Sequence, residues 1–320
     1  MKLATNIIKE ELSVFEKKFE DAVKSNTPLL DRIMKFIIKR KGKQIRPMFV
    51  FLSAKLHGEV NESTYRAAAL VELLHTATLV HDDVVDESLE RRGFFSINAV
   101  WKNKIAVLVG DYLLSKGLLL STSNNDFEHL QILSDDVKKM SEGELLQIEK
   151  SRKLNLSEEI YFEIIKNKTA SLLSSACGIG AYSTSKDLNV TNEMKSFGEK
   201  IGIAFQIKDD LFDYGSDKIG KPTGNDIKEK KLTLPIIYTL NKVDKTTRRK
   251  LIYILKNENK TAAGIKFVIE KVNESGGLAY ATQKMENYRD EALEILNRFN
   301  PGTVRDALED LVRYTTDRKY

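Results

Sequence analysis

Apolar residues recur every three or four positions along most of the chain, which is the spacing of one face of an α-helix. Asn61 can cap a helix that runs to about Glu87, and Thr191 can cap another that Gly215 would end. Pro47 suits the first turn of a third helix. Strand patterns, in which apolar and polar positions alternate between hairpin turns, are hard to find. The pattern therefore predicts an all-α protein with about ten or more helices.

The chain shows no long linker rich in glycine, serine or proline, and it contains only 5 prolines in 320 residues. Its most loop-like stretches are Glu87–Ser96 and Gly215–Lys231, and both are rich in charge. Hydrophobic residues make up 42% of the chain, which is enough for a packed core and argues against disorder. We therefore expect a single domain over residues 1–320, a large helical bundle around a central cavity, with residues 1–25 as a peripheral N-terminal helix.

Charge and cysteine content exclude several classes of protein. The net charge is only +5 and both signs are interspersed, without the basic stripe and interleaved aromatics of a nucleic-acid binder. Glu10 and Glu11 interrupt any signal-peptide core, and no apolar run approaches the roughly 18 residues that span a bilayer. The one cysteine, Cys177, cannot form an internal disulfide. We expect a cytoplasmic protein with no transmembrane segment and no nucleic-acid partner.

Two segments share the spacing DDxxD at the C-terminal end of a predicted helix. Their aspartates are Asp82, Asp83 and Asp86 in HDDVVDE and Asp209, Asp210 and Asp213 in KDDLFDY. The helix dipole already places partial negative charge at this end, so the sequence needs a positive partner there. The first and last aspartates of each segment share one helix face, where two carboxylates can bind Mg²⁺ together with substrate phosphates. A solvated acidic turn is the alternative for either segment taken alone.

Basic side chains cluster around both acidic segments. They are Lys43, Arg46, Arg91, Arg92, Lys221 and Lys231. Lys43 and Arg46 precede a helix start, where free backbone N–H groups also attract anions. Any one of these residues could be an ordinary surface residue, but their concentration favours binding of a diphosphate.

These landmarks occur in one order along the chain: GKQIRP, ELLHTATLVHDDVVDESLERRG, the pair Lys168-Thr169, FQIKDDLFDY and GKPTGNDIKEKKLTLP. With them the chain resembles a trans-polyprenyl diphosphate synthase of the isoprenoid synthase superfamily, from about Leu29 to the C-terminus. The first DDxxD stretch most resembles long-chain synthases such as octaprenyl diphosphate synthase, whose products become quinone side chains. The resemblance implies head-to-tail condensation of isopentenyl diphosphate onto an allylic diphosphate, about three Mg²⁺ per site and a homodimer.

The resemblance also implies a role for each matching residue. The isopentenyl diphosphate site would take Lys43, Arg46, His75 and Arg92. The allylic diphosphate would be held by magnesium on Asp82 and Asp86, with Arg91, Lys221 and Lys231 as basic contacts. Asp209 would bind another magnesium, aided by Asp210, Asp213 and Asp226, and Asp83 completes the candidate metal set. Lys168, Thr169 and Gln206 would stabilise the allylic carbocation. Lys230 stands where many relatives carry glycine.

Two small residues one turn before the first acidic segment bear on product length. Ala77 and Thr78 would let a growing tail descend past them, because one isoprene unit is about as long as a helical turn of roughly 5.4 Å. We therefore expect a product of about seven to ten isoprene units (about C35–C50). The alternatives are a short-chain farnesyl or geranylgeranyl diphosphate synthase, a non-catalytic subunit of a heteromeric synthase, and a helical scaffold or RNA-binding protein.

Overall fold

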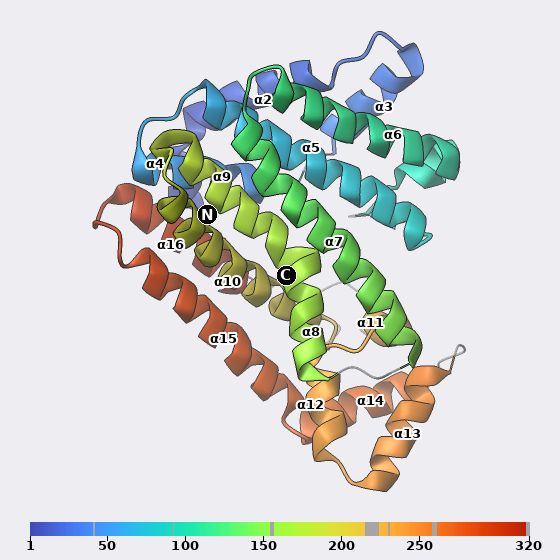
Figure 1. The fold of residues 1–320 in the computed structure, drawn as a ribbon. Coiled ribbons are helices and arrows are strands. Elements are labelled where there is room, and N and C mark those ends of the chain that lie inside the picture. The colour runs from blue at the N-terminus through green and yellow to red at the C-terminus, as the bar shows by residue number, and fades with distance from the viewer. Residues whose placement is uncertain are drawn as a thin grey trace. The chain divides into compact units, whose positions relative to one another are not determined.

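The computed structural model describes residues 1–40, 42–91, 93–153, 157–214, 224–229, 231–257 and 261–317, apart from the side chains of residues 91, 152, 153 and 225. Within these residues the chain forms sixteen α-helices, one π-helical turn and a hairpin of two very short strands (Figure 1). The prediction of an all-α protein is confirmed.

The elements follow one another along the chain as follows. The first are α1 (Lys2–Ile7), α2 (Lys9–Val23), α3 (Pro28–Ile38), α4 (Ile45–His57), α5 (Glu62–Val85), β1 (Glu90–Arg91), β2 (Phe94–Phe95) and α6 (Ile97–Thr122). The middle elements are α7 (Phe127–Lys153), α8 (Glu158–Ile165), the π-helix η1 (Lys166–Ala170), α9 (Ser171–Ser185) and α10 (Leu188–Phe212). The last are α11 (Asn225–Lys228), α12 (Leu234–Lys242), α13 (Lys245–Lys256), α14 (Ala262–Glu274), α15 (Gly277–Leu296) and α16 (Thr303–Asp317).

The chain divides into two compact units, each assembled from three separate segments. The first unit comprises Met1–Asp135, Ser175–Lys195 and Pro301–Leu308, and the second comprises Asp136–Ser174, Ser196–Asn300 and Glu309–Tyr320. The units therefore do not follow one another along the sequence as tandem domains do. The assignment of residues 1–320 to one domain stays a prediction.

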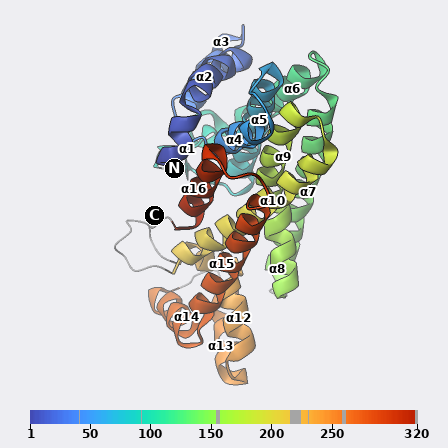
Figure 2. The same ribbon diagram turned by 90° about the vertical axis from the view of Figure 1, so that its left-hand side faces the viewer.

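In the first unit, α5 packs against α2, α4 and α6 (Figure 2). Glycines on α6 allow the close approach of α5, since a Cβ atom at Gly110 would lie 2.1 Å from the His81 ring and one at Gly117 would lie 3.0 Å from Leu70. Residues 1–25 form α1 and α2 rather than one helix, and Phe15 of α2 is fully buried. This packing fixes the C-terminal end of α5, which carries the first acidic segment.

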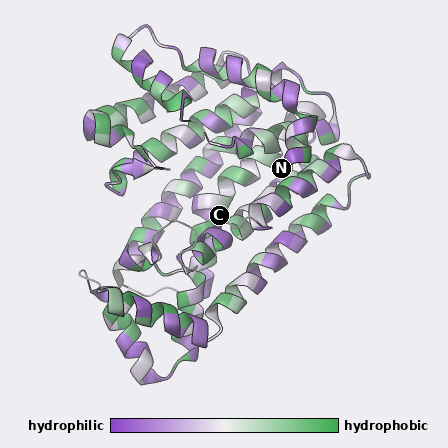
Figure 3. Cartoon of the chain, turned by 180° about the vertical axis from the view of Figure 1, so that it is seen from behind, coloured by the Kyte–Doolittle hydropathy of each residue, from purple (hydrophilic) through white to green (hydrophobic). Residues whose placement is uncertain are grey.

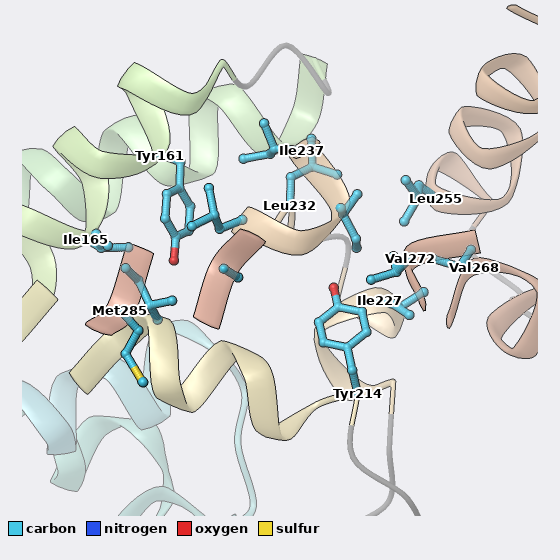
Figure 4. Close-up of a cluster of buried hydrophobic side chains, with 14 of the residues drawn as sticks. Tyr161, Ile165, Tyr214, Ile227, Leu232, Ile237, Leu255, Val268, Val272 and Met285 are labelled. Carbon is cyan, nitrogen blue, oxygen red and sulfur yellow. The ribbon is translucent and has the colours of Figure 1, made fainter. Parts of the chain in front are cut away.

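The second unit has its own apolar core, drawn from α8, α10, α12, α13, α14 and α15 (Figure 4). Gly277 at the start of α15 permits tight packing, because a Cβ atom there would lie 2.7 Å from the Pro235 carbonyl oxygen. Hydrophobic and hydrophilic residues alternate along the long helices, α15 among them, as expected for helices that bury one face (Figure 3).

Two predictions about helix starts had different outcomes. Asn61 caps α5 as predicted, because its side chain accepts from the Thr64 backbone N–H while the Thr64 hydroxyl accepts from the Asn61 N–H. The prediction that Thr191 caps a helix is wrong, since α10 begins at Leu188. Asp187 takes that place, with a carboxylate that accepts from the Asn189 N–H at 2.7 Å. A second capping residue one turn upstream was therefore available in the sequence.

One helix bears on the expectation of no transmembrane segment. Among the described residues, α6 is long and apolar enough to cross a membrane by length and composition alone, and about a third of its most apolar window is buried in the protein. Helices packed inside proteins can have the same length and composition, and α6 packs along α5. The absence of a transmembrane segment stays a prediction.

Candidate active site

The first carboxylate turn lies where α5 ends in the first unit. Asp83 is buried, at 4% exposure, whereas Asp82 is partly buried and Asp86 is exposed. The backbone carbonyl of Asp83 accepts from the Ser88 N–H at 2.9 Å and from the Asn98 side-chain amide at 3.1 Å. The turn is thus fixed from behind, while its two outer carboxylates remain accessible to a ligand.

Arg46 and His75 meet in the first unit. A terminal N–H of the Arg46 guanidinium lies 2.8 Å from His75 Nε2, and since arginine can only donate, that ring nitrogen accepts. Arg46 lies in the first turn of α4, and Lys43 is exposed just before that helix. The structure therefore brings two of the predicted isopentenyl diphosphate contacts together at a helix N-terminus, where an anion is favoured. Arg92 and the side chain of Arg91 lie outside the described residues.

The two predicted chain-length residues differ in surroundings. Ala77 is fully buried in an apolar cluster of the first unit that also contains Leu73 of α5 and Ala106 of α6. Thr78 is only partly buried, and its hydroxyl donates to the His75 carbonyl at 2.9 Å. Of the two side chains, that of Thr78 is partly exposed and can contact a neighbouring group, whereas that of Ala77 is fully buried.

The second carboxylate turn lies at the end of α10 in the second unit. Asp210 is 6% exposed, and its two carboxylate oxygens accept from the Tyr161 hydroxyl at 2.7 Å and from the Gln206 side-chain amide at 2.8 Å. Burial, and secondarily the charge of Asp226, raises the pKa of Asp210 to about 8. Asp209 and Asp213 are partly buried on either side of it.

Asp226 belongs to the same acidic site. Burial, followed by the charge of Asp213, raises its pKa to about 7, and the charge of Lys231 opposes that shift. Its backbone N–H donates to an Asp213 carboxylate oxygen at 3.2 Å, which holds the start of α11 against the turn. Lys231 pairs with Glu229 at 2.6 Å. Lys221 and Lys230 lie outside the described residues.

Lys168 and Thr169 lie on the π-helical turn η1, a type of distortion that is frequent at functional sites. Lys168 forms an ion pair with Glu144 of α7. The Thr169 hydroxyl donates to Gln206 Oε1 at 2.9 Å. This contact is possible because Gly202 lets α10 approach η1 closely, since a Cβ atom there would lie 2.5 Å from the Ala170 Cα.

Sequence reasoning missed three residues that hold the predicted ones in place. Tyr161 contacts Asp210, Glu144 contacts Lys168, and Asn98 contacts the Asp83 carbonyl. A signal existed only for Tyr161, because a tyrosine inside the apolar stretch EEIYFEII needs a partner for its hydroxyl when it is buried.

The chemistry of the acidic side chains fits a divalent metal that arrives with its substrate. Among the residues that the structure describes, no three histidine, cysteine or carboxylate side chains form a ready metal site. Each turn instead offers two outer carboxylates, and Mg²⁺ commonly takes one or two carboxylates and completes its shell with water and phosphate oxygens. The raised pKa values of Asp210 and Asp226 agree with this, because a nearby cation would favour both charged forms.

Comparisons with known proteins point to one family. The model of the family described as polyprenyl synthetase matches residues 27–272. The chain is 32% identical to a heptaprenyl diphosphate synthase component 2 of Bacillus subtilis, over 100% of this chain and 91% of the relative. It is similar to the solved structure of a Caulobacter crescentus polyprenyl synthase complexed with calcium and isoprenyl diphosphate, with a TM-score of 0.92 and 31% identity. This match covers 100% of this chain and 98% of the other. It is also similar to a geranylgeranyl pyrophosphate synthase from Bacteroides thetaiotaomicron, with a TM-score of 0.85, 37% identity and coverage of 99% and 98%.

Proposed function

The chain belongs to the polyprenyl synthetase family and is a prenyltransferase, and we propose that it condenses isopentenyl diphosphate head-to-tail onto an allylic diphosphate. The observation that carries this proposal is the second carboxylate turn. It gathers Asp209, Asp210 and Asp213 with Asp226, whose backbone N–H donates to an Asp213 carboxylate oxygen at 3.2 Å, and carboxylates clustered in this way can hold a divalent cation. Beside it lie two polar groups, the Thr169 hydroxyl and the Gln206 amide, and the proposed reaction requires neither of them to act as a nucleophile.

The first unit supplies the contacts for isopentenyl diphosphate in this proposal. Arg46 provides guanidinium donors for a diphosphate oxygen, and His75 fixes the guanidinium through its 2.8 Å contact. Lys43 adds an exposed ammonium at the start of α4. The outer carboxylates of the first turn, Asp82 and Asp86, would hold the magnesium that binds the allylic diphosphate.

In this proposal, residues of the second unit stabilise the allylic carbocation. Gln206 presents its carbonyl oxygen on the side of Thr169, and that oxygen has a lone pair left for a positive centre after accepting the Thr169 hydroxyl. Lys168 lies in the same π-helical turn and neutralises Glu144.

Mg²⁺, when bound, supplies positive charge that stabilises the diphosphate as it leaves. Asp82 and Asp86 would hold one such ion at the first turn, and Asp209 and Asp213 would hold another at the second turn, since these carboxylates lie at the outer positions of each turn. Asp83 and Asp210 are buried, and in this proposal they support those positions from behind. The Caulobacter crescentus relative is complexed with calcium and isoprenyl diphosphate, which supports a divalent cation as part of the proposal.

A long product, of about seven to ten units, is part of the proposal because Ala77 and Thr78 are small. One relative is named for a heptaprenyl product and another for a geranylgeranyl product, so family membership leaves the length open. Thr78→Tyr is expected to shorten the product, since Thr78 is the more open of the two positions. Thr78→Ser keeps the hydroxyl that donates to His75 and should leave the length unchanged.

The test uses the purified full chain with labelled isopentenyl diphosphate, farnesyl diphosphate and Mg²⁺, and the dephosphorylated products are sized by chromatography. Activity of the chain alone distinguishes an enzyme that acts by itself from one subunit of a heteromeric synthase, an alternative that the name "component 2" of the Bacillus subtilis relative keeps relevant. Products no longer than geranylgeranyl diphosphate would establish the short-chain alternative. An unchanged product length in Thr78→Tyr would refute the channel assignment.

We also propose that the protein is a homodimer and that it is located in the cytoplasm. Val107, Leu108, Leu118 and Leu119 of α6 are 41–64% exposed, and their spacing of eleven residues returns to one helix face. Gly110 and Gly117, which pack against α5, lie on a different side of α6. An exposed apolar stripe of this kind supports pairing with a second copy, and light scattering of the purified protein measures the mass directly.

A further inference from the structure

A buried tyrosine hydroxyl contacts the second carboxylate turn from behind. Tyr161 of α8 is 3% exposed, and its ring packs in the apolar core of the second unit (Figure 4). Its hydroxyl donates to Asp210 Oδ2 at 2.7 Å. A phenylalanine would fill the same volume with no polar atom to satisfy, so the hydroxyl needs a reason beyond packing.

That hydroxyl begins a chain of three hydrogen bonds. Asp210 Oδ1, the other carboxylate oxygen, accepts from Gln206 Nε2 at 2.8 Å. Gln206 Oε1 in turn accepts from the Thr169 hydroxyl at 2.9 Å. The four side chains come from α8, α10 and η1, so the chain of bonds links three separate elements.

The order of donors fixes the direction of the Gln206 amide. The amide nitrogen of Gln206 faces Asp210 and the amide oxygen faces Thr169. The charged form of Asp210, which a bound cation would favour, can only accept and therefore keeps the amide in this direction. The opposite orientation would place the N–H₂ group, the positive end of the amide dipole, beside Thr169. A carbocation stabilised at Thr169 and Gln206 needs the oxygen there.

We propose that Tyr161 is a positioning residue for prenyl transfer, which holds the Asp210 carboxylate so that Gln206 keeps its carbonyl oxygen toward the reacting carbon. This inference rests on the proposed role of Gln206 and Thr169. Without the hydroxyl, one oxygen of Asp210 loses its donor and the carboxylate can turn about its side-chain bond. The Gln206 amide then loses its fixed partner and populates both orientations.

The experiment compares Tyr161→Phe with Tyr214→Phe. Tyr214 is a matched control, because it is also buried in the same apolar core and its hydroxyl contacts the neutral Thr233 at 2.6 Å rather than a carboxylate. Tyr161→Phe is expected to lower kcat about 10- to 100-fold while the KM values for both diphosphates change less than about 2-fold. Tyr214→Phe is expected to keep kcat within about 2-fold, and melting curves report whether each variant is folded.

A double-mutant cycle separates positioning from a structural effect. If Tyr161 acts through Gln206, the variant Tyr161→Phe/Gln206→Ala is no slower than Gln206→Ala alone. Asp210→Asn tests the same link from the carboxylate, and it should likewise lower kcat and be non-additive with Gln206→Ala. It also provides the measurement if Tyr161→Phe does not fold.

Three outcomes would overturn the inference. They are wild-type kcat in Tyr161→Phe, an equal loss in Tyr214→Phe, and additive losses in the double variants. An active wild-type protein with any of these results leaves the proposed function standing. A wild-type protein that makes no prenyl product with Mg²⁺ would overturn both the proposed function and this inference.

Discussion

The two carboxylate turns share the spacing DDxxD, but the protein holds them in different ways. Both end helices of similar length, 24 residues in α5 and 25 in α10, and in both the middle aspartate is buried. The first turn is held through its backbone, because the Asp83 carbonyl accepts from Asn98. The second is held through a side chain, because the Asp210 carboxylate accepts from Tyr161 and Gln206.

The difference shows that one motif can be held by two kinds of acceptor, a backbone carbonyl in the first turn and a carboxylate in the second. A carboxylate used as a buried acceptor must lose water, and that cost raises its pKa, to about 8 for Asp210. A backbone carbonyl used in the same place carries no charge to desolvate. The group that holds the second turn therefore titrates, whereas the Asn98 amide that holds the first turn carries no charge.

The largest expected effect is on catalysis, and it tests whether both turns take part. Asp82→Ala and Asp209→Ala each remove one proposed magnesium ligand, and each is expected to lower kcat about 100- to 1,000-fold because charge on the departing diphosphate is less well stabilised. Steady-state assays with Mg²⁺ measure the loss. Asp111→Ala is the control, since Asp111 is an exposed aspartate of α6 outside the proposed site. Wild-type activity in either variant would remove that turn from the mechanism.

A smaller effect is expected on stability, and it tests the charge state of the second turn. The pKa values of Asp210 and Asp226 are raised from 3.8 to about 8 and about 7, so the folded protein binds protons that the unfolded chain releases. Without divalent cations these two groups should therefore lower the free energy of unfolding as the pH rises from about 4 to about 8. Buried His129, whose pKa is lowered to about 4, acts in the opposite direction up to about pH 6.5, so the fall is expected most clearly between about pH 6.5 and pH 8. Thermal melts in EDTA across this range measure the slope.

Two comparisons sharpen that stability test. Asp210→Asn removes one of the two groups, so its melting temperature should depend less on pH than that of the wild type. Mg²⁺ should raise the melting temperature more at pH 8 than at pH 6, because a cation bound beside Asp210 and Asp226 would favour their charged forms, and at pH 6 both groups must first lose a proton. A melting temperature of the metal-free wild type that rises steadily up to pH 8 would contradict the assigned pKa direction.

The smallest expected effect concerns the backbone tether of the first turn. Asn98→Ala removes the amide that donates to the Asp83 carbonyl, and the Ser88 N–H remains as a second donor to that carbonyl. We expect a loss of about 1 kcal/mol in the free energy of unfolding, with no change in its pH dependence. Asn124→Ala is the control, because Asn124 is exposed and its amide also donates to a backbone carbonyl. If the free energy of unfolding lost in Asn98→Ala depended on pH as strongly as the stability of the second turn does, the difference between the two turns would be contradicted.

Much of the fold could be predicted from the chain itself. Helical periodicity, the Asn61 cap and Pro47 in the first turn of α4 all act within a few residues, so they are visible in sequence. The family could also be recognised, because its motifs are contiguous stretches in a fixed order. The start of α10 was misplaced because Asp187 and Thr191 are both good caps, and local sequence does not decide between them.

The sequence by itself determined which residue types are available for the proposed chemistry: two pairs of outer carboxylates, a Lys-Thr pair and basic residues at the start of α4. Only the tertiary structure decided how those groups are held and charged. Tyr161 is 49 residues from Asp210, and Asn98 is 15 residues from Asp83, so neither contact follows from local spacing. The pKa of a carboxylate depends on the water it loses and on the charges around it, and both are set by packing between distant segments.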